Sequence, residues 1–120
     1  MRILLADDQS KVRFALRVLL ERQPGVVVQG EAADAEDLLV QIGEICPDML
    51  LLAWELPGFV PSELLAALHT ACPSLQVIAL SGRPEARRSA LEAGVDAFVS
   101  KADPPERLLS AIQIASRGNA

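Results

Sequence analysis

Short apolar runs alternate with longer amphipathic stretches along the whole chain. A period of about 3.6 residues predicts helices, and short apolar runs between turn residues predict strands. The predicted strands cover residues 3–6, 26–28, 49–52, 76–80 and 97–99. The predicted helices cover residues 10–21, a stretch that begins after Asp34 and contains Leu38, Leu39 and Ile42, and then residues 61–71, 84–93 and 104–117.

The strict alternation of strand and helix predicts a single α/β domain. Strand–helix–strand units with short loops form a parallel sheet through right-handed crossovers, with helices on both faces. Residues 49–52, Met-Leu-Leu-Leu, are apolar without interruption, so we expect a central strand that is covered on both sides. In such sheets the functional crevice lies beyond the carboxyl ends of the strands.

Chemically capable side chains follow several of the predicted strands. Asp7 and Asp8 follow the first strand, Glu55 lies just beyond the third, and Ser81 and Lys101 follow the fourth and fifth. Adjacent carboxylates suit Mg²⁺, and a hydroxyl with an ammonium suits an anion such as a phosphoryl group. Each residue alone is weak evidence for a binding site. The prediction rests on all of them following strands that end at the same edge of the sheet.

Composition narrows the function classes. The chain has 120 residues and a formal net charge of −5, which argues against nucleic-acid binding by this segment. No apolar run reaches the ~20 residues of a membrane helix, and acidic residues interrupt the N-terminus too early for a signal peptide. Cys46 and Cys72 form no metal-binding motif, so we expect reduced thiols in a cytoplasmic protein.

Four segments resemble the receiver domains of bacterial response regulators, the signal-accepting modules of two-component systems. They are Leu4–Asp8, Pro47–Gly58, Ile78–Gly82 and Ala93–Lys101, and the similarity extends over essentially the whole chain. The resemblance implies a flavodoxin-like, doubly wound sheet of five parallel strands in the order 2-1-3-4-5, with five helices. The segment 100–108 is most similar to the same segment of receivers that precede helix-turn-helix output domains. Residues 1–120 would therefore form one receiver domain, which an output domain could follow.

The resemblance also implies a role for each site residue. Asp7 and Asp8 match the acidic pair that holds Mg²⁺, and the backbone carbonyl of Glu55 matches a further metal ligand. Ser81 and Lys101 match the hydroxyl and ammonium that contact the phosphoryl group. Phe98 matches the aromatic residue that changes rotamer when the receiver switches. The resemblance further implies a histidine kinase as partner and transcription regulation through an output domain. The receiver itself would be a signalling module and not an enzyme.

Ala53 departs from the family, because it stands where receivers carry the aspartate that accepts the phosphoryl group. Alanine has no nucleophilic oxygen, so we expect no phosphorylation there and weakened or absent Mg²⁺ binding. Two explanations stay open: a natural pseudo-receiver that acts by conformational change, partner binding or dimerisation, or an engineered phospho-null form of an ordinary receiver. A flavodoxin-like phosphohydrolase is a remote alternative, since Asp7-Asp8-Gln9 lacks the expected Asp-x-Asp pattern.

Two further features carry expectations. Ala102 stands where the family usually has a cis proline, so we expect a trans bond or a rearranged loop. Phe14 lies about 200° around its helix from Val12, so it faces away from the core. With Val18 and Leu109, it would form an apolar patch on the first and last helices, which are neighbours in the family. That patch predicts either ordinary surface residues or a homodimer interface.

Overall fold

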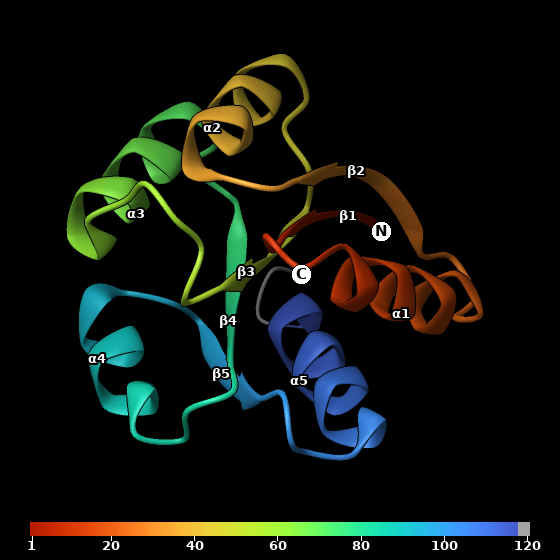
Figure 1. The fold of residues 1–120 in the computed structure, drawn as a ribbon. Coiled ribbons are helices and arrows are strands. Elements are labelled where there is room, and N and C mark those ends of the chain that lie inside the picture. Colours follow the sequence, from red (N-terminus) through yellow and green to blue (C-terminus); the bar gives the residue numbers. More distant parts are fainter. Residues whose placement is uncertain (118–120) are drawn as a thin grey trace.

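The computed structural model describes residues 1–117 and shows a five-stranded sheet between two layers of helices (Figure 1). The strands are β1 (Arg2–Ala6), β2 (Val27–Ala32), β3 (Met49–Ala53), β4 (Gln76–Ser81) and β5 (Ala97–Ser100). The helices are α1 (Ser10–Glu21), α2 (Ala35–Glu44), α3 (Pro61–Ala71), α4 (Ala86–Ala93) and α5 (Pro105–Arg117).

The sheet is parallel throughout and has the order β2-β1-β3-β4-β5, which confirms the predicted fold class. β3 lies at its centre, and all five of its residues are buried. This placement explains why β3 is apolar without alternation, since both of its faces meet helices. The register aligns Ala6 of β1 with Leu52 of β3, so the two strands end side by side.

Each face of the sheet supports its own core. On one face, Leu4, Leu50 and Leu52 pack with the buried residues of α2, α3 and α4. On the other face, Ile3 and Leu5 pack with Leu20 of α1 and with Leu108 and Ile112 of α5. Figure 1 shows α1 and α5 side by side on this second face. Successive strand residues therefore serve opposite cores, as the two-residue period of a strand requires.

Several predicted boundaries need correction. β2 extends from Val27 to Ala32 and includes polar residues, because it is an edge strand with one side free of sheet partners. α4 begins at Ala86 and α5 at Pro105, each slightly later than predicted. Leu39 of α2 is 39% exposed, because the buried stripe of that helix consists of Ala35, Leu38 and Ile42.

The cysteine expectation is also wrong. Cys46 and Cys72 form a disulfide bond across 26 positions of sequence, with their Cα atoms 5.7 Å apart. That Cα separation lies within the range that a disulfide can bridge. Cys46 lies in the loop after α2 and Cys72 caps the end of α3, so the chain brings together two residues whose sequence spacing suggested no pairing.

Three further observations complete the description of the fold. The described residues contain no cis peptide bond, so the bond before Ala102 is trans. Gly94 ends α4 with a φ of 110°, a left-handed conformation that suits glycine. No helix in residues 1–117 is long and apolar enough to cross a membrane.

Candidate functional site

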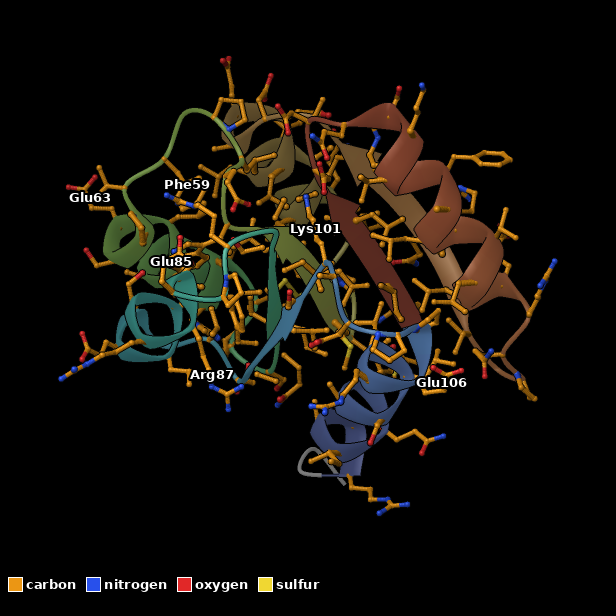
Figure 2. The ribbon with its side chains drawn as sticks, turned by 60° about the horizontal axis from the view of Figure 1, so that its bottom comes forward. Phe59, Glu63, Glu85, Arg87, Lys101 and Glu106 are labelled. Carbon is orange, nitrogen blue, oxygen red and sulfur yellow. A yellow bond between two sulfur atoms is a disulfide. The ribbon has the colours of Figure 1, made fainter. Side chains whose placement is uncertain are left out.

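The carboxyl ends of β1, β3, β4 and β5 bring four predicted site residues to one edge of the sheet. Asp7 follows β1, Ala53 ends β3, Ser81 ends β4 and Lys101 follows β5. In Figure 2 the side chain of Lys101 extends from the end of β5 toward the end of β1. The parallel topology thus produces the convergence that the sequence predicted.

Asp7 forms the buried acidic centre of this edge. Its side chain is 2% exposed, and its Oδ2 lies 2.8 Å from Nζ of Lys101, which is 23% exposed. Its other oxygen, Oδ1, accepts a hydrogen bond of 2.9 Å from the backbone N–H of Gln9. A buried carboxylate needs such compensation, because burial alone disfavours the charge. Lys101 therefore neutralises Asp7 directly.

Ser81 is engaged in a second network on the other side of the site. Its hydroxyl donates to Oε1 of Glu55 and accepts a hydrogen bond of 3.0 Å from the backbone N–H of Arg83. Nε of Arg83 lies 3.6 Å from the same Glu55 oxygen. The backbone carbonyl of Ser81 accepts from the N–H of Lys101 at 2.8 Å, which ties the ends of β4 and β5 together.

Ala53 lies between these two networks and is 1% exposed. The next residue, Trp54, donates from its backbone N–H to the carbonyl of Leu80 at 2.7 Å. Its indole Nε1 donates to Oγ of Ser89 on α4 at 3.1 Å, and its ring meets the edge of Phe59. Trp54 thereby connects the end of β3 to α4, beside a methyl group that offers no polar atom.

The residues at this edge do not complete a magnesium site. Receiver domains generally bind Mg²⁺ at their phosphorylation site, through carboxylates and other oxygen ligands. Within residues 1–117 no group of three potential metal-binding side chains comes together. Of the predicted ligands, Asp7 is paired with Lys101 and Asp8 is exposed. The donor set therefore does not fit a firmly held cation.

The other predicted residues lie apart from this edge. Phe98 on β5 is half-buried and packs against the core under α2, α3 and α4. On the opposite face, Phe14 is 69% exposed and Val18 is 38% exposed on α1. Leu109 on α5 is half-buried and packs against the core there. Phe14 is thus the most exposed member of the predicted patch.

Arg13 is a supporting residue that the sequence did not suggest. Its guanidinium donates to the backbone carbonyl of Asp7, and its Nε donates to Glu31 of β2 at 2.9 Å. Arg17 also donates to Glu31, at 2.8 Å. Burial raises the pKa of Glu31, but the hydrogen bonds from Arg17 and Arg13 outweigh it and hold that pKa below its ordinary value. Two arginines of α1 therefore neutralise the carboxylate of Glu31 on β2.

Comparison with known proteins defines the class. The model of the family described as response regulator receiver domain matches residues 3–113, and the chain belongs to this family.

Among its relatives are the nitrate/nitrite response regulator protein NarL of Escherichia coli, 32% identical over 97% of this chain, and the transcriptional activator protein ExaE of Pseudomonas putida, 35% identical over the whole chain. The chain spans 55% and 57% of the length of these two proteins.

Solved structures agree with the fold. The crystal structure of a two-component response regulator of the LuxR family from Aurantimonas has a TM-score of 0.88 and 31% identity, and covers 98% of this chain and 85% of the other. RcsB of Salmonella enterica, solved bound to the promoter rprA in the presence of the phosphomimetic BeF3⁻, has a TM-score of 0.86 and 25% identity, over 98% of this chain and 60% of the other. These relatives are signalling proteins and not typical enzymes.

Proposed function

We propose that this receiver domain signals without accepting a phosphoryl group at residue 53. The observation that carries the proposal is the buried methyl group of Ala53 at the end of the central strand, where the family places its acceptor. Phosphoryl transfer needs a nucleophilic oxygen in line with the donor, and alanine has none. The site would therefore have lost its covalent chemistry while keeping the receiver fold.

The polar residues around Ala53 support this reading, because they contact one another. Lys101 pairs with Asp7, and Ser81 donates to Glu55. In a receiver that accepts phosphate, Ser81 and Lys101 would contact the phosphoryl oxygens. Here both contacts are internal, so the conformation of the site would be set by packing and hydrogen bonds. Input would then arrive as a binding event and not as a modification.

The partners follow from the family. Two-component receivers typically work with histidine kinases, so a kinase or a related protein would dock near the site without transferring phosphate. Because the relatives named above are transcription regulators of nearly twice this length, the chain would control a DNA-binding output domain, and this segment would not bind nucleic acid itself. We also propose a cytoplasmic location, as for the regulators that the chain resembles. The Cys46–Cys72 disulfide is unusual for that compartment, because the cytoplasm keeps thiols reduced.

The test is a titration with Mg²⁺ and BeF3⁻, followed by NMR of the backbone amides. The unmodified chain should show no saturable shifts at Ser81, Lys101 or residues 53–55. The Ala53→Asp variant should show them, because it regains the carboxylate that would hold the mimic. Saturable shifts of the unmodified chain would refute the proposal. Shifts restored by Ala53→Asp would also be those expected of an engineered phospho-null receiver.

Self-association is the second part of the proposal. We propose that Phe14 and Val18 of α1, with Leu109 of α5, form a homodimer contact. Phe14 carries most of the exposed apolar surface of the three. Light scattering at high concentration should show a dimer that Phe14→Ser abolishes. Val40→Ser on α2, where Val40 is 54% exposed, is the matched control and should leave the dimer intact. A monomer at all concentrations would refute this contact.

A further inference from the structure

A hollow of about 420 Å³ opens between α1 and α5, directly beside the site. Leu80 of β4 and Val99 of β5 form its floor, Ala15 and Leu16 of α1 form one wall, and Leu108 of α5 forms the other. Pockets that hold small molecules commonly enclose about 300–1,000 Å³ and are mostly apolar. This hollow is of that size and that character.

The sequence of α1 explains why the hollow exists. Ala15 is the small residue on the side of the helix that faces α5, so no long side chain fills the space there. Val12, Leu16 and Leu19 line the same wall and are only half-buried. Their apolar surface remains partly in contact with water, and a bound apolar group would remove it, which is favourable.

One end of the hollow is lined by two lysines. Lys11 lies in the first turn of α1 and Lys101 follows β5, so both ammonium groups belong to the carboxyl-end edge of the sheet. Among the described residues Lys11 has no ion-pair partner within 4.0 Å, whereas Lys101 pairs with Asp7. Asp103 also lines the hollow, where its negatively charged carboxylate accepts a hydrogen bond from the backbone N–H of Ser100 at 3.2 Å, and Lys11 is therefore the lysine of this end that is free to pair with a ligand.

The shape and the charge together specify a ligand class. The apolar wall continues from Lys11 to Leu19, about 12 Å along the helix, which matches a saturated chain of roughly eight to ten carbons. We propose that the hollow binds a medium-chain carboxylate, with its chain on the apolar walls and its carboxylate at Lys11 and Lys101. We name this hollow the α1–α5 groove.

Such a ligand would reach the site through Lys101. The ligand carboxylate would compete with Asp7 for the Lys101 ammonium, so occupation of the groove would alter the ion pair that now neutralises Asp7. This part of the inference deepens the proposed function, because it supplies an input that needs no phosphoryl acceptor. Binding in the groove itself does not depend on whether residue 53 can be phosphorylated.

The experiment is an NMR titration of the full chain with decanoate below its micelle concentration, and with decan-1-ol as the uncharged probe. Decanoate should give saturable shifts at Ala15, Leu16, Leu108 and Lys101. Decan-1-ol should bind more weakly by about threefold or more, the value of an exposed charge contact. Equal affinity for the two probes would overturn the assigned role of the lysines, and the absence of saturable shifts with decanoate would overturn the groove as a site.

Two pairs of variants sharpen the result. Ala15→Leu fills the groove and should weaken decanoate binding by about tenfold, whereas Ala67→Leu, at an exposed position of α3, should not change it. Lys11→Gln should weaken decanoate binding by about threefold, and Arg22→Gln, beyond the end of α1, should leave it unchanged. If Ala67→Leu or Arg22→Gln reduced binding as much as its counterpart, decanoate would be binding elsewhere and the assignment would be wrong. Amide shifts far from the groove report that each variant is folded.

Discussion

The Lys101–Asp7 pair provides the sharpest energetic prediction of the structure. Replacing Lys101 by Met preserves much of the side chain's length and removes its charge. The carboxylate of Asp7, 2% exposed, then loses the ammonium that lies 2.8 Å from its Oδ2. The N–H of Gln9 would remain as its hydrogen-bond donor. The variant should therefore leave a buried charge with incomplete compensation.

The magnitude follows from the burial of the two groups. Removing one partner of a fully buried pair costs about 3–5 kcal/mol. Because the Lys101 side chain is 23% exposed, water reaches the gap and reduces the cost, and we expect Lys101→Met to lower the free energy of unfolding by about 2–3 kcal/mol. Asp7→Asn removes the carboxylate charge and should make the loss of Lys101 nearly neutral. The coupling energy between the two substitutions should then be about 2–3 kcal/mol.

The assay is urea denaturation followed by the fluorescence of Trp54, the one tryptophan of the chain. The four proteins of the cycle are the unmodified chain, Lys101→Met, Asp7→Asn and the double variant. Lys11→Met is the matched control, because Lys11 is exposed and should change the free energy of unfolding by less than about 0.5 kcal/mol. Additive single effects, or a loss from Lys101→Met as small as that of the control, would refute the reasoning.

Three other predictions concern stability. The lowered pKa of Glu31 makes its ionised form stabilising by about 1 kcal/mol, a contribution that is present above the ordinary pKa and lost as the pH falls through the lowered folded value. Glu31→Gln should therefore lower the free energy of unfolding at pH 7, and this effect should shrink as the pH is lowered through the acidic range in denaturation experiments. An equal effect at neutral and acidic pH would contradict this. Gly30→Ala should lower the free energy of unfolding by about 1–3 kcal/mol, because the new Cβ would lie 2.5 Å from Oε1 of Gln41 and 3.0 Å from Cδ1 of Leu4. Gly43→Ala should stabilise the fold, because Gly43 lies in α2 and a Cβ there would meet nothing within 4 Å. The reverse order of stability would show that the edge of the sheet adapts freely. Cys46→Ser should lower the free energy of unfolding by about 3 kcal/mol, because the disulfide closes a loop of 26 positions. A reductant should lower the stability of the unmodified chain by the same amount and should not affect the variant. Two free thiols in the untreated, denatured protein would exclude the bond.

The sheet was predictable because its strands and helices have different periods. Residues 49–52 are apolar without a break, and they became the buried central strand. The weaker predictions lie at the edge of the sheet, where burial no longer dictates the sequence. β2 contains Gln29 and Glu31, and its polar half carried no apolar signal that could have extended the predicted strand.

The candidate site was predictable as a set of positions but not as a set of contacts. The rule that parallel strands end at one edge brought Asp7, Ser81 and Lys101 together. The pairing of Lys101 with Asp7, and of Ser81 with Glu55, depends on the distances between side chains in the folded protein, which the sequence does not give. Arg13 was missed for a related reason, because its partners Asp7 and Glu31 belong to two different strands.

The disulfide shows a different limit of sequence reasoning. Cys46 and Cys72 lie in loops that follow different helices, and their pairing depends on how α2 and α3 pack on the same face of the sheet. The relevant quantity is the 5.7 Å between their Cα atoms, which no spacing in the sequence contains. The α1–α5 groove likewise arises from packing, since Ala15 alone would suggest only an ordinary helical alanine.

The central claim is that the receiver fold is retained while residue 53 cannot accept a phosphoryl group. The most direct measurement is intact-protein mass spectrometry after incubation with Mg²⁺ and a small phosphodonor, with Ala53→Asp treated in parallel. The unmodified chain should gain no mass, and Ala53→Asp should gain that of one phosphoryl group. Stoichiometric labelling of the unmodified chain would contradict the claim and would place the acceptor on another residue, with Asp8 the first to examine.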